Sequence, residues 1–213
     1  MSKGYEILRL GDLEPLPGVN NGDALLIPVR HTLGVRAFGV NAWTAPVGKA
    51  VVPPHEEDSG HEELYAVVRG RATFTVDGAT LDAPAGTLVH VLPGEHRTAI
   101  AEEEGTIVFV TGGAAGVAFE PGGWEELVVA FAAGRAGRVE EGREAMHALP
   151  EVEDRAWVKP YNIACYEALF GDRDKAFELL TAASSSDDAR ELARNDNDLD
   201  SLRDDPRWEE VVG

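Results

Sequence analysis

Cysteine and basic residues are scarce in this sequence, and it contains no long apolar run. The single cysteine, Cys165, excludes an internal disulfide and a zinc finger built on cysteines. The 19 Lys and Arg residues are outnumbered by 38 Asp and Glu residues, which gives a formal net charge of −19. Nucleic acids and anionic membranes are bound through basic residues, so we expect neither partner. With no apolar stretch suited to a signal peptide or a membrane span, a reducing cytoplasm is the expected location.

The 213 residues are enough for one large domain or two small ones. Up to about residue 119 the chain shows short alternating apolar segments broken by Gly, Pro and Asp, a pattern typical of antiparallel strands in a sandwich or barrel. Asp77-Gly78 predicts a hairpin, because both residues tolerate the positive φ of a two-residue turn. The expected strands are Ala24–Pro28, Val35–Thr44, Lys49–Val52, Glu63–Arg69, Arg71–Val76, Ala79–Ala83, Thr87–Leu92, Arg97–Ala101 and Thr106–Thr111, with no helices between them.

From Trp124 onward the apolar residues recur at spacings of three and four, which predicts helices. Between two of these helices, Gly171-Asp172 supplies a stop and a cap. The acidic segment from Ser184 to Asp188 is expected to be a solvated loop. The expected helices are Trp124–Ala133, Arg138–Ala148, Val158–Phe170, Arg173–Ala183 and Ala189–Asn195. With the glycine-rich residues 112–116 as the joint, we expect a mainly β domain over residues 1–119 and a helical domain over residues 120–213.

Two segments of the β-rich part carry a recognisable pattern of residues. The first runs from Gly48 to Gly70, and the second from Asp82 through a Pro-x-Gly turn to Arg97. In this order, with a hairpin between them, they resemble the two motifs of the cupin family. The resemblance implies a double-stranded β-helix, which is a jelly-roll barrel, and a homodimer formed through outer strands. It also implies a divalent metal held inside the barrel by three His and one Glu.

The sequence departs from this family pattern at most of the metal positions. The His-x-His position reads His55-Glu56-Glu57, so the second imidazole is replaced by a carboxylate. Glu63 is retained, and His61 precedes it by two residues, on the same face of a strand. At the last position the count falls on Arg97, with His96 one residue early and therefore on the opposite face.

Three interpretations of this cluster stay open. In the first, a mixed N/O site holds one divalent transition metal (iron, manganese, nickel or zinc) and the barrel is a dioxygenase or isomerase of the cupin type. The residues of this site would be His55, Glu57, His61, Glu63 and His96. In the third interpretation, residues 56–59 form an ordinary solvated loop, and the barrel serves only as a dimerisation module. The second interpretation is described next.

The second interpretation is the preferred one. Here Arg97 takes the place of the metal and pairs with Glu63, which would be costly to bury alone. The barrel then needs no cofactor and binds a small polar ligand near Glu63 and Arg97, with Tyr65 and His61 beside them. Whether the barrel is an enzyme stays open.

The helical part has a resemblance of its own. Tyr161–Tyr166 followed by Gly171–Ala176 is similar to the helix–turn–helix of a TPR repeat, and Asp196–Trp208 is similar to the segment that closes such repeats. This resemblance implies packing, self-association or contact with a protein partner. Because only one good repeat is present, we expect no long peptide-binding groove.

Overall fold

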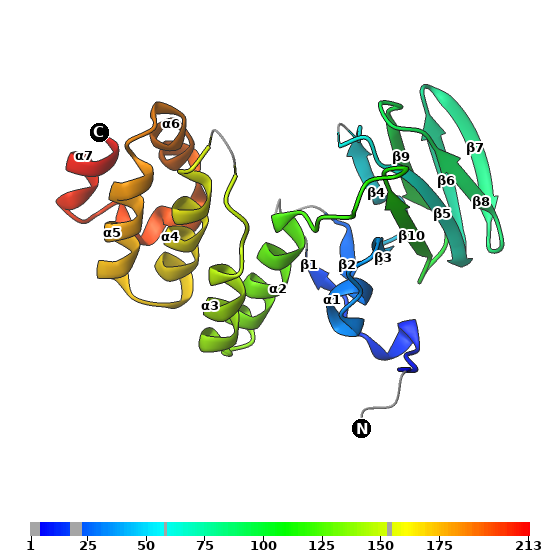
Figure 1. Ribbon diagram of the computed structural model, residues 1–213, viewed down its shortest axis with the longest axis horizontal. Helices are drawn as coiled ribbons and strands as arrows, with labels where there is room; N and C mark the ends of the chain where they lie inside the picture. The colour runs from blue at the N-terminus through cyan, green and yellow to red at the C-terminus, as the bar shows by residue number, and fades with distance from the viewer. Residues whose placement is uncertain (1–4, 18–22, 58, 153–154) are drawn as a thin grey trace. The chain divides into compact units, whose positions relative to one another are not determined.

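The computed structural model describes residues 5–17, 23–57, 59–152 and 155–213. The chain divides into two compact units, Met1–Pro121 and Gly122–Gly213, with the strands in the first and most of the helices in the second (Figure 1). The mixed β plus α fold class is therefore as predicted. Within the described residues, no helix combines the length and the apolarity that crossing a bilayer requires.

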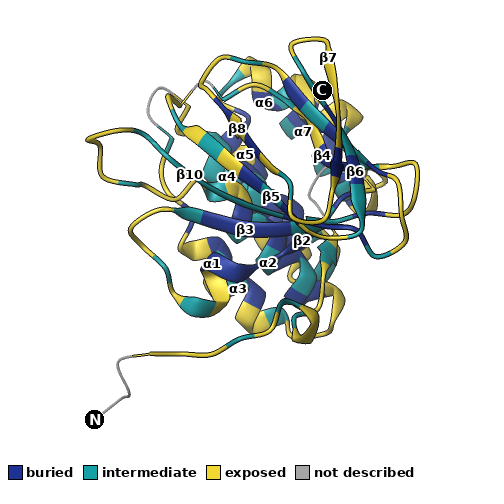
Figure 2. Cartoon of the chain, turned by 90° about the vertical axis from the view of Figure 1, so that its right-hand side faces the viewer, coloured by how far each residue is buried: buried dark blue, intermediate teal, exposed yellow. Residues whose placement is uncertain are grey.

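The strands of the first unit form two antiparallel sheets. The spatial order of the larger sheet is β1 (Leu16–Pro17), β2 (Leu25–Ile27), β3 (Gly39–Thr44), β10 (Ile107–Gly113), β5 (Glu62–Arg69) and β8 (Leu88–Val91). The order of the smaller sheet is β4 (Ala50–His55), β9 (Arg97–Ala101), β6 (Arg71–Val76) and β7 (Ala79–Pro84). Buried and exposed residues alternate along several strands (Figure 2). The buried face of each sheet contributes to one shared core, which includes Val52, Tyr65, Val67, Phe74, Val91, Ala99 and Val108.

The predicted hairpin at Asp77-Gly78 is confirmed. Both residues have positive φ, +47° and +80°, and Val76 pairs with Ala79 across the turn. This two-residue loop brings β6 and β7 together in register, as the twist of paired strands favours.

A short helix interrupts the strands where the sequence pattern predicted none. Helix α1 (Val29–Leu33) follows Pro28 and ends at Gly34, whose φ of +62° a residue with a side chain rarely adopts. Its apolar residues pack in a second, smaller core with Val40 and Ile107, outside the barrel core. The expected strand Val35–Thr44 was therefore too long, and β3 begins only at Gly39. A 3-10 turn, η1 (Leu10–Asp12), precedes α1.

Two boundaries near the site also differ from expectation. Strand β4 continues through Pro53 and Pro54 to His55. Proline has no backbone N–H to donate, but it is tolerated here because β4 is an edge strand and its pairing with β9 shifts register at these residues. Gly112 and Gly113 belong to β10 rather than to a linker. A Cβ on Gly112 would lie 2.9 Å from the Glu62 carbonyl oxygen and 3.1 Å from Cγ of Glu63, so glycine permits the close approach of β5.

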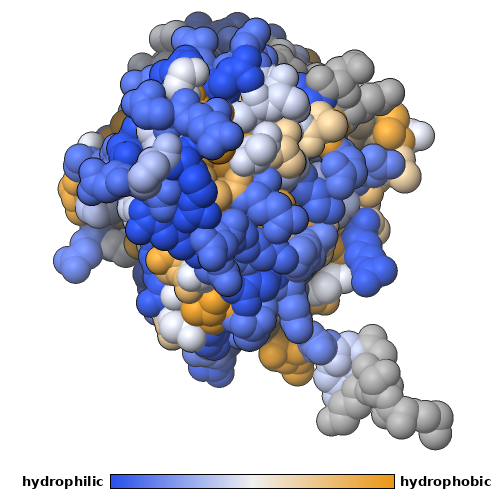
Figure 3. All heavy atoms as spheres, turned by 90° about the vertical axis from the view of Figure 1, so that its left-hand side faces the viewer, coloured by the Kyte–Doolittle hydropathy of each residue, from blue (hydrophilic) through white to orange (hydrophobic). Residues whose placement is uncertain are grey.

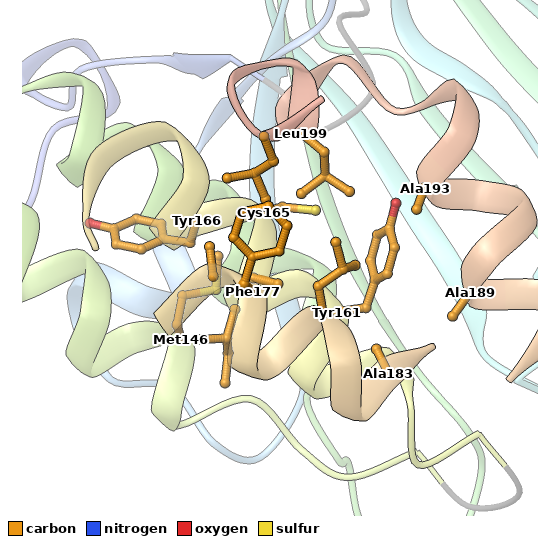
Figure 4. Packing of buried hydrophobic residues seen from close by; sticks show 14 of the residues in the cluster. Met146, Tyr161, Cys165, Tyr166, Phe177, Ala183, Ala189, Ala193 and Leu199 are labelled. Atoms are coloured by element: carbon orange, nitrogen blue, oxygen red, sulfur yellow. The ribbon is translucent and has the colours of Figure 1, made fainter. Parts of the chain in front are cut away.

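The second unit is a helical array. It contains α2 (Gly123–Arg135), α3 (Val139–His147), α4 (Val158–Phe170), α5 (Arg173–Ala183), α6 (Asp187–Asn195), the 3-10 helix η2 (Asn197–Leu202) and α7 (Arg207–Val212). The prediction of a solvated loop from Ser184 to Asp188 is wrong in part. Asp187 and Asp188 begin α6, where their negative charges suit the helix dipole. The Asp172 carboxylate caps α5 by accepting from the N–H groups of Asp174 and Lys175, as predicted. Cys165 is a core residue, packed among Tyr161, Tyr166 and Leu199 (Figure 4).

Candidate functional site

Three strands from both sheets bring ionisable side chains into the barrel. His55 ends β4 and pairs directly with Arg97, the first residue of β9. Glu63 comes from β5 in the other sheet, on the same face as the buried Tyr65 and Val67. Because side chains alternate along a strand, this face is the one that lines the core. The site is thus a polar group within an otherwise apolar barrel interior.

One carboxylate oxygen is the centre of this group. Oε2 of Glu63 lies 3.0 Å from Nη2 of Arg97 and 3.6 Å from Nε2 of His55. The Tyr65 hydroxyl donates a short hydrogen bond to the same oxygen. Among the described residues, none donates to the other oxygen, Oε1. Glu63 therefore faces three polar groups at Oε2 and keeps Oε1 as an acceptor.

Arg97 is fully buried, with 0% of its side chain exposed, whereas Glu63 and His55 are 15% and 33% exposed. Its Nη1 donates to the Glu95 carbonyl oxygen at 2.8 Å. Within the described part of the chain, Nε and Nη2 of Arg97 have no hydrogen-bond acceptor in suitable geometry. The contact between Nη2 and Glu63 is therefore an ion pair without a well-aligned hydrogen bond. Because Arg97 does not reach solvent, it contacts Glu63 but is not accessible to a molecule outside the barrel.

The charges of the cluster shift the ionisation of two residues. Burial by itself raises the pKa of Glu63, but the hydrogen bonds from His55 and Tyr65 and the Arg97 charge outweigh it, so the pKa of Glu63 lies below its ordinary value. The hydrogen bond to Glu63 raises the pKa of His55 above 6.5, against the opposing effects of desolvation and Arg97. Glu63 is accordingly an anion at neutral pH, and His55 holds its proton more tightly than a free imidazole.

Hydrogen bonds also fix the orientation of the site residues. Nδ1 of His55 lies 2.7 Å from the Pro53 carbonyl oxygen, so Nδ1 carries a proton and Nε2 faces Glu63. The Tyr65 ring packs edge-on against Phe74, and burial raises the pKa of its hydroxyl, which stays a neutral donor. Tyr65 is thus both a core aromatic and a partner of Glu63.

The structure separates the remaining candidate residues. Ligand atoms of His55, Glu57 and Glu63 lie within 4.8 Å of one another. His61 is outside this group, because it lies before β5 and its ring packs against Phe119 with 5.7 Å between centroids. His96 is exposed, with its backbone N–H directed to Asp77, as the one-residue offset from Arg97 requires. Of the expected solvated loop, Glu56, Glu57 and Ser59 lie outside the strands, with Glu56 and Ser59 exposed and Glu57 half-buried, and Asp58 is outside the described residues.

The residues present fit a divalent metal poorly. One imidazole and two carboxylates converge, but the Arg97 guanidinium lies 3.0 Å from one of these carboxylates, that of Glu63. A divalent ion bound to the same oxygen would lie no more than about 5 Å from this fixed positive charge. At an effective dielectric constant of about 20, the repulsion is on the order of 6 kcal/mol. Glu57 is also less available to a metal, because the Ser59 hydroxyl donates a hydrogen bond to its Oε2 at 2.6 Å.

Comparison with known proteins gives structural likenesses only. No family model and no curated protein matches the amino-acid sequence. Among solved structures, the chain is similar to a cupin protein from Bacteroides fragilis, at 21% identity over 56% of this chain and 92% of that one, with a TM-score of 0.40. It is also similar to a predicted oxalate decarboxylase from Thermotoga maritima (17% identity, 50% and 96% covered, TM-score 0.40). A third is a sugar phosphate isomerase of the cupin superfamily from Silicibacter pomeroyi (17% identity, 50% and 74% covered, TM-score 0.43). Likeness at this level carries no conclusion about the activity of this chain.

Two features that support the site were not predicted from the sequence. The Glu95 carbonyl, which accepts from Arg97, gives no signal in the sequence because backbone groups are the same at every residue. Gly112 was assigned to the glycine-rich joint, whereas it lies in β10, where its small size leaves room for Glu63.

Proposed function

We propose that the first unit is a cupin-type barrel that binds a small polar ligand without a metal. Glu63 and His55 contact the ligand, and Arg97 is the buried counter-ion that keeps Glu63 charged and oriented. The observation that carries this proposal is the 3.0 Å contact between Glu63 and an arginine that is completely buried.

The charge of Arg97 explains how Glu63 can act as an acceptor. A carboxylate in an apolar interior is costly unless a partner compensates its charge, and otherwise takes up a proton. Arginine stays protonated throughout the physiological pH range, so Arg97 holds Glu63 in its ionised form without depending on a metal. The open oxygen Oε1 then accepts from a hydroxyl or amino group of the ligand. The exposed part of the His55 ring contacts the same molecule.

Elemental analysis of the protein purified without added metal tests this function directly. We expect substoichiometric transition metal in the unaltered protein and no change in Glu63→Ala. A thermal-shift screen with small hydroxy acids, amino acids and sugars is expected to find compounds that stabilise the protein but not Glu63→Gln. The exposed Glu104→Gln is the matched control and should leave every response unchanged.

The second candidate function is a metal-dependent enzyme of the cupin type, a dioxygenase or isomerase. It is favoured by the convergence of His55, Glu57 and Glu63 within 4.8 Å. A near-stoichiometric metal that is lost in Glu63→Ala would establish this alternative and overturn the metal-free pocket. Retention of that metal in Arg97→Ala would show that the guanidinium does not take the place of the ion.

A third proposal concerns self-association of the barrel. The outer face of β5 and β8 exposes Leu64, Val68 and Leu88, and β8 is the last strand of its sheet. An unpaired edge beside apolar side chains favours antiparallel pairing with the same edge of a second copy. We expect Leu88→Lys to reduce the mass measured by light scattering to that of a monomer. Leu81→Lys, at an exposed position of the other sheet, should have no effect; a monomeric unaltered protein would rule out the dimer.

For the second unit we propose that α4 and α5 form a single TPR-like helix–turn–helix, closed by η2 and α7. The cap at Asp172 and the shared core of these helices support it. In this view the helical unit contributes packing and contact with a partner rather than chemistry.

A further inference from the structure

Two glycines lie beside Glu63 at the end of the larger sheet. Gly39, the first residue of β3, pairs with Gly112 of β10, and Gly112 in turn pairs with Glu63 of β5. Paired residues of antiparallel strands direct their side chains to the same face, so both glycines belong to the inner face that carries Glu63. A Cβ on Gly112 would lie 3.1 Å from Cγ of Glu63, which agrees with this placement. Because neither glycine has a side chain, another segment of the chain can approach the sheet here.

That segment is the one that follows β10, residues 114–119, which we call the strap. The Val117 N–H donates to the Ala114 carbonyl oxygen at 3.2 Å and closes a turn just after the strand. The third residue of this turn is Gly116, with a φ of +73°, a conformation that glycine adopts at little cost. The turn reverses the chain, so that Phe119 returns to the sheet at Gly39.

The Phe119 ring lies on the inner face of the sheet. A Cβ on Gly39 would be 3.1 Å from Cε2 and 3.4 Å from Cζ of this ring, so the ring covers Gly39 on the side that also carries Glu63. Its other neighbour is the His61 ring, at 5.7 Å between centroids and 34° between planes. His61 comes two residues before Glu63 in the chain. The two rings therefore border the end of the barrel at which Glu63 is partly exposed, by 15%.

The strap places apolar ring surface near a hydrogen-bond acceptor. Phe119 is only half-buried, and residues 115–118 before it are exposed. A phenyl ring does not compete for Oε1 of Glu63, the oxygen to which none of the described residues donates. Exposed aromatic surface favours contact with a further ring, either offset or edge-on. This end of the barrel thus offers two different contacts to one molecule.

We infer that the ligand of the barrel joins a hydrogen-bond donor to an apolar ring. This inference rests on the metal-free binding function proposed above and adds the class of ligand. The hydroxyl or amino group of the ligand donates to Oε1 of Glu63, and its ring packs on Phe119. Phe119 is therefore a specificity-determining residue, because it favours ring-bearing ligands over the small polar molecules that Glu63 alone would accept.

Titration of the full-length, ¹⁵N-labelled protein followed by NMR tests this inference with three probes. Benzyl alcohol carries both the donor and the ring, benzyl methyl ether has the ring without a donor, and glycerol has donors without a ring. We expect benzyl alcohol to shift the amide signals of Glu63, Gly112 and Phe119. It should bind about tenfold more tightly than either of the other probes, because each of them lacks one of the two contacts.

Substitutions of Phe119 separate the ring from the carboxylate. Phe119→Ala should weaken binding of benzyl alcohol by about tenfold and leave that of glycerol unchanged, since only the ring contact is lost. Phe119→Leu keeps an apolar side chain over Gly39 but has no ring, and it should weaken binding several-fold. Val117→Ala, at an exposed position of the strap, is the matched control and should bind like the unaltered protein.

A second control lies away from the barrel. Leu192 is an exposed apolar residue of α6, and Leu192→Ala should leave the affinity for all three probes unchanged. Figure 3 views the molecule from the side on which α5, α6 and α7 lie and shows hydrophilic side chains around smaller apolar patches. This control therefore reports any unspecific binding of the ring to exposed apolar side chains.

The outcomes distinguish this inference from the function on which it rests. If glycerol binds as tightly as benzyl alcohol and Glu63→Gln abolishes both, the barrel binds polar ligands without selection by Phe119, and the inference is overturned. It is also overturned if Phe119→Ala, or Phe119→Leu should the alanine variant not fold, binds benzyl alcohol as tightly as Val117→Ala. If no probe shifts these amides, or if Glu63→Gln changes no affinity, the proposed binding function fails as well.

Discussion

Replacement of Arg97 by methionine should destabilise the barrel strongly. Methionine fits the apolar surroundings but leaves the Glu63 carboxylate, 15% exposed, without its cation. Removal of one partner of a buried ion pair costs about 3–5 kcal/mol. Because Glu63 keeps its contacts to Tyr65 and His55, we expect a loss near the lower end, about 3 kcal/mol. Since whole domains are stable by only about 5–15 kcal/mol, the effect is large.

A second substitution should reverse this loss. In the double variant Arg97→Met with Glu63→Leu, no charge is left buried, and paired apolar replacements of buried ions are often neutral or stabilising. We therefore expect the double variant to lie within about 1 kcal/mol of the unaltered protein, which is a coupling of about 3 kcal/mol between the two sites.

Hydrogen exchange of peptides from β5 and β9 is the suitable assay, because it reports on the barrel separately from the helical unit. Arg71→Met provides the control, since Arg71 forms an exposed ion pair with Asp82 at 2.7 Å, and exposed pairs contribute little to stability. The reasoning is refuted if Arg97→Met costs no more than Arg71→Met. It is also refuted if the costs of Arg97→Met and Glu63→Leu simply add, because the two side chains would then be uncoupled.

Other expected outcomes concern ionisation, metal affinity and the helical core. In Glu63→Gln, the pKa of His55, measured by NMR titration, should fall below 6.5. Desolvation and the Arg97 charge, which lower this pKa, then outweigh the Pro53 hydrogen bond, which raises it. An unchanged pKa would contradict the pairing of His55 with Glu63. In the unaltered protein, the stability from His55 should fall as pH rises through its raised pKa, and that from Glu63 should fall as pH drops through its lowered pKa, both measurable by denaturant unfolding. Arg97→His should increase affinity for zinc or manganese in equilibrium dialysis, since an imidazole replaces the repelling cation; equal affinity would show that Arg97 does not exclude metals. Gly171→Ala should lower the melting temperature by several degrees, because its Cβ would clash with the buried Glu167 carboxylate, whereas Gly137→Asn, at an open positive-φ turn, should change it little.

Local patterns in the sequence predicted most of the elements. Helices α4 and α5 have the predicted boundaries, because their apolar spacing and the Gly171-Asp172 signal agree. The hairpin at Asp77-Gly78 followed from two residues that tolerate positive φ. Helix α1 was missed because it is short and lies between strands, where no run of apolar spacing reveals it.

The site was predicted in part. Glu63 was assigned by its position in the cupin-like pattern, and Tyr65 because it lies two residues further along on the same face of the strand. His61 was assigned to the same site by that spacing, but the strand begins only at Glu62, and the ring turns to Phe119. Strand alternation holds only inside the strand, so one residue beyond its end the rule no longer places the side chain.

By itself, the sequence predicted a β-rich part followed by a helical part, and the face of β5 that carries both Glu63 and Tyr65. The pairing of Arg97 with Glu63 was one of the interpretations that the sequence left open, and in the structure the two groups lie 3.0 Å apart. The tertiary structure alone decided that His55 lies opposite Arg97 on the neighbouring strand and also faces Glu63. This depends on the register shifts in β4, on the two glycines that extend β10, and on the packing of one sheet over the other. None of these is a local property of the residues, because register and sheet packing are fixed only when distant segments share one core.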